Sequence, residues 1–299
     1  MAWNTEKPNE LDELKRQLWE KSDKQFAFRG QADCDWELKS VFDRPRECEA
    51  VPKKPPVQNN YASLLERERV LLGDFAKRAR RFLSGSERWI IDRYCCQPKG
   101  PSVWHVMAMG RHYGLATRAL DWTSSVLVAA YFAANDKADK DGALWWFDKS
   151  KLERILHEGW DRWDVPKRRS DPRGERAIEE RAFQENYEHS WVTQIYFPVP
   201  FPRMEAQRAF LTVCSRLGVN HCHAIECLSC KNQCNIERGK IVIPRDQKEA
   251  LLDYLEGIGI SAHGLLYPGA DIVAQQINQS EFSHRSNAPV VAEASREGA

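Results

Sequence analysis

The sequence predicts an α+β fold in a single domain, with a small mixed or antiparallel central sheet flanked by helices. Segments with apolar residues every three or four positions occur beside short runs rich in β-branched and aromatic residues. The two kinds of segment follow one another in a mixed order, which favours α+β over a regularly alternating parallel fold. With 299 residues, of which 42% are hydrophobic, the chain is long enough to bury a substantial core.

Helical periodicity marks five segments of the sequence. They are residues 9–21, 61–84, 104–114, 126–135 and 245–260. The third of these ends at Gly114, a residue type that commonly follows a helix.

Short apolar runs predict the strands of the sheet. They are residues 26–30, 142–148, 208–215 and 239–244. Residues 192–203 should also be extended, because their prolines exclude a helix.

We expect one domain over residues 1–282, followed by a disordered tail at 283–299. Three segments interrupt the domain. They are a surface insertion rich in Pro and Lys at 43–60, a highly charged helical and loop insertion at 149–190, and a Cys-rich insertion at 221–238.

The charge of the chain is high but balanced. Lys and Arg number 44 against 43 Asp and Glu, so no overall field attracts nucleic acid, and anions must bind at local clusters. No apolar run is long enough to span a bilayer, and the first residues are polar and acidic, so we expect a cytoplasmic protein with no membrane contact. In that compartment the nine Cys should be free thiols or metal ligands.

Four blocks in the same order resemble the FRG-domain family, which takes its name from a Phe-Arg-Gly motif. The blocks are FRGQADCDWELKSVFDR (28–44), MGRHYGLATRALDWTSSVLVAAYFA (109–133), RMEAQRAFLTV (203–213) and KIVIPRDQKEALLDYLEGIGISAHGLLYP (240–268). The resemblance extends from about residue 9 to residue 278. The chain departs from the family at Arg111, where Gln is usual, and at Ala116, where Pro is usual.

The chain also resembles arginine-type mono-ADP-ribosyltransferases, in which an aromatic-Arg-Gly run stands on the first core strand. A strand rich in Ser and Thr and then a Glu- or Gln-containing stretch follow in those enzymes. Here the order is Arg29, then Thr123 to Ser125, then Glu205 and Gln207. The resemblance implies an ADP-ribosyltransferase-like core that uses NAD as a substrate.

The residue types in this arrangement are suited to binding the parts of NAD. The guanidinium of Arg29 offers forked donors to phosphate or ribose oxygens, and Gly30 would let the ligand approach the backbone. Hydroxyls of Thr123 and Ser124 could hold ribose. Gln207 or Glu205 would support the positive charge that develops as nicotinamide leaves.

Two points of that hypothesis stay open. Glu205 would share a side with Gln207 only if the stretch is a strand. The structural alternative for Arg29 is an ion pair with Asp121 or Asp35, because an unpaired charge in a core is unfavourable.

The stretch HYGLATRALDWTS has two interpretations. In the functional one, His112 and Tyr113 stack on nicotinamide or adenine, Arg118 binds phosphate and Asp121 orients its neighbours. In the structural one, His112 caps a helix, Arg118 pairs with Asp121 and Trp122 fills the core. The resemblance also places three further residues beside NAD. They are Phe28, Gln31 and Thr117.

The Cys-rich insertion is a candidate structural zinc site. Its possible ligands are Cys222, Cys227, Cys230 and Cys234. Free thiols on a loop are the alternative. Basic clusters at 76–83 and 167–169 are either solvated surface or contacts for RNA or DNA.

These observations lead to an NAD-dependent, ADP-ribosyltransferase-like cytoplasmic effector, such as the toxin of a toxin–antitoxin or phage-defence system. Its acceptor would be nucleic acid or protein, and an antitoxin or inhibitor protein would restrain it. The alternative is a non-catalytic module that binds a nucleotide, RNA or a protein.

Overall fold

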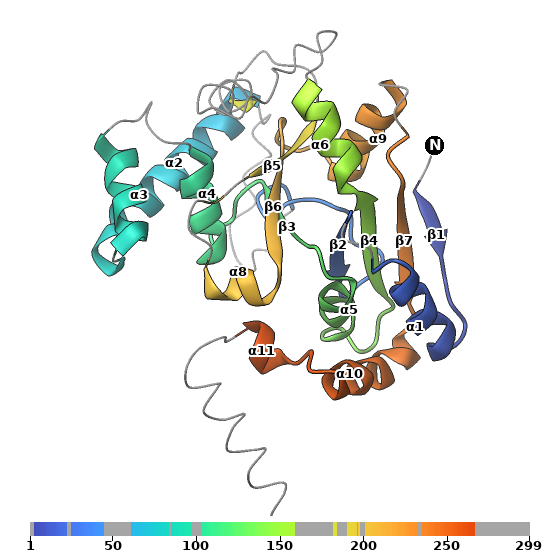
Figure 1. Cartoon of the computed structure of the whole chain (residues 1–299). Helices are drawn as coiled ribbons and strands as arrows, with labels where there is room; N and C mark the ends of the chain where they lie inside the picture. Colours follow the sequence, from blue (N-terminus) through green and yellow to red (C-terminus); the bar gives the residue numbers. More distant parts are fainter. Residues whose placement is uncertain are drawn as a thin grey trace, which may run out of the picture.

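The protein folds as a single mixed β-sheet with helices on both faces, as the computed structural model shows (Figure 1). The structure describes residues 3–22, 25–44, 61–83, 85–96, 103–158, 182–183, 190–195, 197, 201–231 and 235–266. The predicted α+β class is confirmed.

The sheet has seven strands in the order β1-β7-β4-β2-β3-β6-β5. They are β1 (Asn4–Glu6), β2 (Phe26–Gln31), β3 (Ala119–Thr123), β4 (Gly142–Asp148), β5 (Val192–Ile195), β6 (Ala209–Cys214) and β7 (Arg238–Ile243). The pair β1 and β7 is parallel, and every other neighbouring pair is antiparallel. Apolar runs predicted β2, β4, β6 and β7, whereas β1, which is short and polar, and the central strand β3 were not among them.

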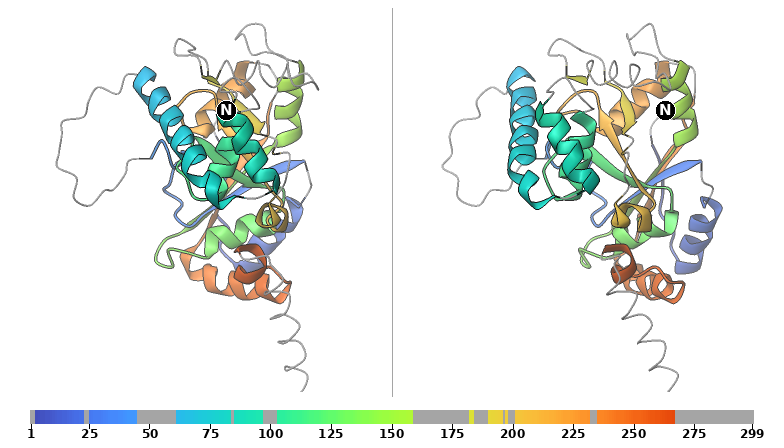
Figure 2. Two further views of the ribbon diagram at one scale, coloured as in Figure 1. Left: turned by 90° about the vertical axis from the view of Figure 1, so that its left-hand side faces the viewer. Right: turned by 60° about the vertical axis from the view of Figure 1, so that its left-hand side comes forward.

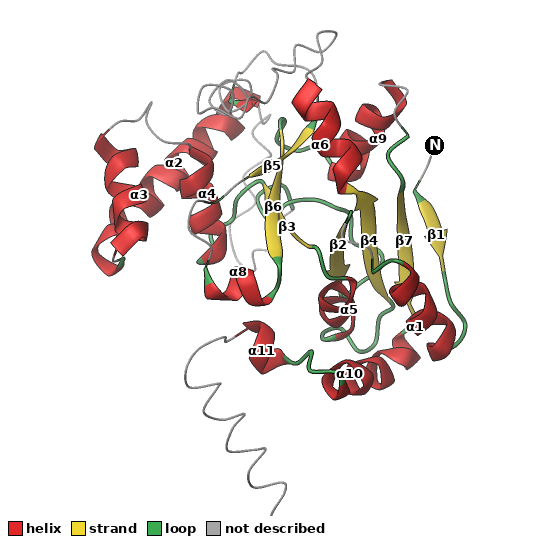
Figure 3. Cartoon of the chain, viewed as in Figure 1, coloured by secondary structure: helices red, strands yellow, loops and turns green. Residues whose placement is uncertain are grey.

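Helices surround the sheet, as the red elements of Figure 3 show. They are α1 (Leu11–Glu20), α2 (Tyr61–Ala79), α3 (Gly85–Cys96), α4 (Val103–His112), α5 (Val126–Ala134), α6 (Lys149–Glu158), α8 (Pro202–Ala206), α9 (His221–Lys231), α10 (Lys248–Gly257) and α11 (Ala262–Leu266). Short 3₁₀ turns, Arg80–Phe82 and Arg245–Gln247, adjoin α2 and α10. All five predicted helices are present, and Gly114 follows α4 with a φ of 86°.

Strand alternation divides the apolar side chains into two cores, one on each face of the sheet. On β2, Phe26 and Phe28 pack with α1, α5 and α10, whereas Ala27 packs with the core beneath α2, α4 and α6. The two views in Figure 2 show the helices on either side of the strands.

Helix α5 lies unusually close to strands β2 and β4. A Cβ atom added to Gly30 would stand 1.9 Å from the carbonyl oxygen of Ala129, and one added to Gly142 would stand 2.3 Å from that of Ala133. The close approach also explains why α5 is rich in alanine. The structure therefore gives Gly30 a packing role against α5, which the sequence analysis did not anticipate.

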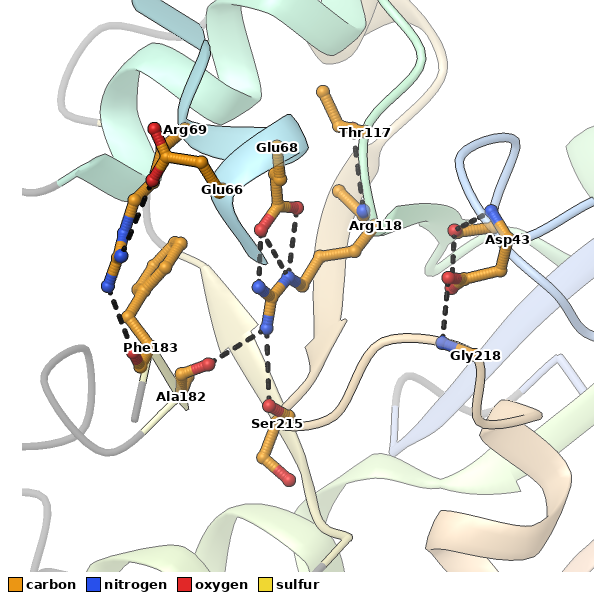
Figure 4. Close-up of polar contacts among 12 residues, drawn as sticks. Asp43, Glu66, Glu68, Arg69, Thr117, Arg118, Ala182, Phe183, Ser215 and Gly218 are labelled. Atoms are coloured by element: carbon orange, nitrogen blue, oxygen red, sulfur yellow. Dashed lines mark hydrogen bonds and ion pairs between the residues drawn. The ribbon is translucent and has the colours of Figure 1, made fainter. Parts of the chain in front are cut away.

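A buried ion pair joins α2 to the segment before β3 (Figure 4). The guanidinium of Arg118 bonds the carboxylate of Glu68 through Nε at 2.9 Å and through Nη2, and its Nη1 donates to the carbonyls of Ala182 and Ser215. Both side chains are almost fully buried. Burial disfavours the charge of Arg118, but Glu68 outweighs it and raises the pKa. Neither predicted role of Arg118 is correct, because it contacts neither Asp121 nor an open site.

Several expectations from the sequence are wrong or lie outside the described residues. Residues 202–206 form helix α8 rather than an extended segment, and α3 and α9 were not predicted. Residues 45–60, 159–181, 184–189 and the 283–299 tail lie outside the described ranges. None of the described helices has the length and apolar character needed to cross a membrane.

We expect Glu68→Ala to lower the free energy of unfolding by about 3–5 kcal/mol, because it leaves Arg118 buried without its counter-charge. Urea unfolding followed by circular dichroism measures the loss. The double variant with Glu68→Leu and Arg118→Met should recover part of it. Glu20→Ala is the control, since its pair with Arg16 is largely exposed and should change stability by no more than about 0.5 kcal/mol.

Gly30→Ala should lower stability by roughly 1–3 kcal/mol or more, because the added methyl group meets the backbone of α5. Gly73→Ala is the matched control in helix α2, where an added Cβ meets nothing within 4 Å. That change should stabilise the protein by roughly 0.5–1 kcal/mol. Equal effects at the two glycines would contradict the close packing of α5.

Candidate functional site

A cavity opens where strands β2 and β3 separate. The two strands pair at a single position, Phe28 with Thr123. Beyond it, the backbone carbonyl of Asp121 accepts a hydrogen bond from Nη1 of Arg29 at 2.6 Å. The side chain of Arg29 thus takes the place of a strand-to-strand hydrogen bond, and a cavity of about 520 Å³ lies beside it. This volume is in the range of small-molecule sites.

Asp121 is one of the two carboxylates that line the cavity. Its Oδ2 accepts from Nε and Nη2 of Arg111 at 2.9 and 2.5 Å, and stands 3.7 Å from Nη1 of Arg29. Burial alone would raise the pKa of Asp121, but Arg111 and then Arg29 outweigh it and lower the pKa. Asp121 is therefore ionised at neutral pH.

Arg29 is mostly buried, and its charge is only partly balanced. Burial lowers its pKa to about 10; Asp121 opposes this shift, whereas Arg111 and Arg44 add to it. Its Nε has no hydrogen-bond partner. That Nε is itself buried, but the side chain is still charged at neutral pH. The predicted alternative, a pair with Asp121, is present together with the open cavity.

The lining of the cavity carries an excess of positive charge. Four arginines line it, Arg29, Arg44, Arg111 and Arg203, whereas its carboxylates are Asp121 and Asp136. Among the residues that the structure describes, neither Arg44 nor Arg203 makes an ion pair with a carboxylate. The cavity is therefore suited to an anionic ligand.

Two hydrogen bonds fix Gln207 at the end of α8. The hydroxyl of Thr123 donates to the Gln207 carbonyl at 2.7 Å, and the Gln207 Nε2 donates to the carbonyl of Leu265 at 2.9 Å. Because Nε2 is held there, the orientation of Oε1 is fixed too. The same Thr123 hydroxyl accepts from the backbone N–H of Ser125 at 2.9 Å.

Glu205 does not share the position of Gln207. The expectation that they lie on one side depended on a strand, but Glu205 belongs to helix α8, where residues two apart point in widely different directions. Gln207 lines the cavity, together with Arg203 and Met204 of the same segment, and Glu205 is not among the lining residues.

His112 supplies an aromatic ring to the cavity. It stacks on Phe201 with ring centroids 3.8 Å apart and the planes within 4°. Burial, and next the charge of Arg203, lower the pKa of His112 below its ordinary 6.5, so the ring is neutral at pH 7. The adjacent Tyr113 is exposed, and its hydroxyl donates to Glu87 at 2.6 Å.

A buried lysine holds two of the segments that line the cavity. The Nζ of Lys248, at the start of α10, donates to the carbonyls of Ala32, Asp136 and Lys137 at 2.8 to 2.9 Å. Ala32 and Asp136 line the cavity. Burial lowers the pKa of Lys248, and the nearby aspartates oppose the shift.

The structure brings together most of the predicted ligand-binding residues. Those that line the cavity are Phe28, Arg29, Gly30, Gln31, His112, Asp121, Thr123 and Gln207. Those that do not are Tyr113, Thr117, Arg118, Ser124 and Glu205. Thr117 is fully buried. The side chain of Gln31 is itself engaged, because its Oε1 accepts from the Trp145 indole at 2.7 Å.

One family model matches this chain. Residues 24–142 match the model of the FRG domain. The chain contains an FRG domain. The match includes the first two blocks recognised in the sequence, whereas the blocks at 203–213 and 240–268 lie beyond it. No curated protein and no solved structure matches the chain.

The FRG-domain match covers the segments that supply most of the cavity. It contains β2, the loop with Trp36 and Arg44, helix α4 and strand β3. Arg203 and Gln207 come from the segment after the match. The cavity therefore combines matched and unmatched parts of the chain.

Sequence reasoning missed an exposed aromatic side chain of the cavity and its three further arginines. They are Trp36, Arg44, Arg111 and Arg203. Trp36 and Arg44 stand in the same recognised block as Arg29, and Arg111 is the departure from the family's usual Gln. Arg203 is the first residue of the block at 203–213, so treating every charged or aromatic residue of the recognised blocks as a candidate would have found all four.

The predicted zinc site is only partly described. Cys222 and Cys227 lie on helix α9 rather than on a loop, and burial raises the pKa of the Cys222 thiol to about 12. The Sγ of Cys227 stands 3.5 Å from Nε2 of His223. Cys234 and the side chain of Cys230 lie outside the described residues, so the zinc hypothesis stays a prediction.

We expect Asp121→Asn to reduce stability most at neutral pH. The folded-state pKa of Asp121 is lowered, so its ionisation stabilises the fold above its unfolded pKa of about 3.9 and ceases to do so as pH falls through the lower folded value. Urea unfolding of both proteins from pH 7 to pH 3 should show the difference shrinking in acid. A difference that grows in acid would contradict this assignment.

Proposed function

We propose that the cavity binds NAD and that this FRG-domain protein is an NAD-consuming, ADP-ribosyltransferase-like effector. One observation carries the proposal. Arg29, Thr123 and Gln207, which are far apart in the sequence, line a single cavity whose lining has an excess of arginine. These are the positions that the sequence compares with the NAD site of arginine-type ADP-ribosyltransferases.

The charges of the cavity suit the pyrophosphate of a dinucleotide. Arg44 and Arg203 have no carboxylate partner among the described residues, and the charge of Arg29 is balanced only in part by Asp121. Guanidinium groups bind phosphate oxygens through two parallel hydrogen bonds. Asp121 already orients Arg29 and Arg111, so these two side chains need little rearrangement to receive a ligand.

The proposed reaction breaks the bond between nicotinamide N1 and C1′ of the adjoining ribose. The electron pair leaves with nicotinamide, which becomes neutral, and positive charge develops on the ribose. A nucleophile of the acceptor then bonds to C1′ and releases its proton to solvent. The fixed Oε1 of Gln207 is the dipole available to stabilise the developing charge.

A nucleic acid acceptor has one supporting feature, the exposed basic surface at the end of α2. Lys77, Arg78 and Arg81 are exposed there, whereas Arg80 pairs with Asp92. The second basic cluster, 167–169, lies outside the described residues. A protein acceptor, and an inhibitor protein that restrains the enzyme, remain part of the proposal.

The second candidate is a nucleotide-binding module without chemistry. Two observations favour it. Glu205 is not among the residues that line the cavity, and the carboxylate of Asp121 is already bound by Arg111. In that case NAD would raise the melting temperature of the protein while no nicotinamide is released.

The test is incubation of the protein with NAD labelled in its adenylate phosphate, together with RNA, DNA or cell-lysate protein. We expect label to reach one acceptor and nicotinamide to be released in equal amount. Gln207→Ala should reduce the rate by at least tenfold, since a dipole directed at the developing charge typically contributes more than that. Glu205→Ala is the matched control two residues away and should retain the wild-type rate.

The result separates the candidates. Binding of NAD without nicotinamide release, in folded protein, leaves the binding module. Loss of activity in Glu205→Ala with full activity in Gln207→Ala would contradict the assignment of the site. Absence of any NAD binding would overturn the proposed function in both forms.

A further inference from the structure

Trp36 is an exposed aromatic side chain inside the cavity. Large apolar side chains are exposed at several places in the described part of the chain, and Trp36, which is 37% exposed, is the one of them that lines the cavity. Lone exposed apolar residues on a convex surface need no explanation. An indole exposed in a concave, cationic site offers a flat surface on which a ring of a ligand can stack.

Arg44 lies beside the indole of Trp36. Its guanidinium carbon stands 5.5 Å from the ring centroid, and its Nε donates to the carbonyl of Lys39 at 3.3 Å. Its remaining guanidinium nitrogens have no carboxylate partner among the residues described. An aromatic ring next to an available guanidinium can bind a base and the adjoining phosphate together.

The ring of His112 also lines the cavity, at the side of α8. His112 is stacked on Phe201, which immediately precedes α8, and α8 supplies Arg203 and ends at Gln207. The sheet order places β3 between β2 and β6. The loop that follows β2 and the helix that precedes β6 therefore reach the cavity from opposite sides of β3.

We propose that NAD lies in this cavity in one direction, with its adenine against Trp36 and Arg44 and its nicotinamide ribose toward Gln207 and His112. The inference rests on the proposed function and adds the orientation of the substrate. Trp36 then acts as the recognition residue for the adenosine half. The pyrophosphate lies between the two ends, near Arg29. The reacting C1′ atom is thereby brought to the amide of Gln207.

A purely structural role for Trp36 makes a different prediction. If Trp36 only supports Arg44 and the loop after β2, its removal should weaken every anionic ligand of the cavity to a similar extent. If it stacks on adenine, only ligands that contain adenine should be affected. Nicotinamide mononucleotide has a phosphate but no adenine, so it separates the two roles.

The experiment compares the dissociation constants of NAD, AMP and nicotinamide mononucleotide, measured by calorimetry on the full chain. For Trp36→Ala, we expect NAD and AMP to bind roughly 5- to 150-fold more weakly, the usual effect of losing one base–aromatic stack. Binding of nicotinamide mononucleotide should change by less than about twofold. Trp36→Phe should retain most of the wild-type affinity, because it keeps an aromatic ring.

Trp89→Ala is the matched control, since Trp89 is also exposed, at 54%, but does not line the cavity. It should leave all three constants unchanged. Far-ultraviolet circular dichroism and the melting temperature establish that each variant is folded. If Trp36→Ala proves unfolded, Trp36→Leu serves in its place and should show the same selective loss, as it removes the aromatic ring but keeps an apolar side chain.

Each other outcome overturns the inference in a recognisable way. Equal weakening of all three ligands would show that Trp36 only shapes the cavity, and selective weakening of nicotinamide mononucleotide would show the reverse orientation. Unchanged binding would mean that Trp36 contacts no ligand. In these three cases wild-type protein binds NAD and the proposed function survives, whereas failure of wild-type protein to bind any of the ligands would remove both.

Discussion

The site depends on the gap between strands β2 and β3, which the guanidinium of Arg29 bridges. Two neighbouring strands in the middle of a sheet normally exchange backbone hydrogen bonds along their length. Here they pair at one position, and Nη1 of Arg29 reaches the carbonyl of Asp121 instead. The sheet stays connected while a cavity opens inside it. The Phe-Arg-Gly run reflects the same constraint, because Phe28 fills the core, Arg29 spans the gap and Gly30 admits α5.

The arrangement leaves the cavity with charges that the protein balances only in part. Asp121 neutralises one of the two arginines that it contacts, and Arg44 and Arg203 stand without a carboxylate among the described residues. Arg203 is exposed, but Arg29 is mostly buried and Arg44 is half-buried, and cations withdrawn from water in this way are unfavourable unless a counter-ion arrives. An anionic ligand would therefore neutralise part of the positive charge of the site.

The fold could be predicted from the sequence largely because its elements have strong local patterns. The apolar period of α2 and α10 and the β-branched run of β7 are readable without tertiary information. Helix α8 could not be recognised, because it has five residues between prolines and a strand, and short helices carry little periodicity. The partner of Arg118 could not be predicted either, since Glu68 lies fifty positions away on the apolar face of a helix. Within the site, Arg29, Asp121 and Gln207 were accessible through motifs. Arg203 stands in the same block as Gln207 but was overlooked, because its position near His112 depends on the path of the chain.

The hydrogen bonds of Lys248 show that the cavity depends on residues far beyond the family match. The family match stops at residue 142, the first residue of β4. Strand β2 pairs with β4 and strand β3 pairs with β6, so both lose a partner there, and the carbonyls of Ala32 and Asp136 are held by a lysine more than a hundred positions beyond the match. A fragment cut at the boundary of the match would expose two strand edges and release one wall of the cavity. The motif-bearing half is thus not an autonomous module, and shortened versions made for biochemistry or crystallisation have to keep the chain through α11.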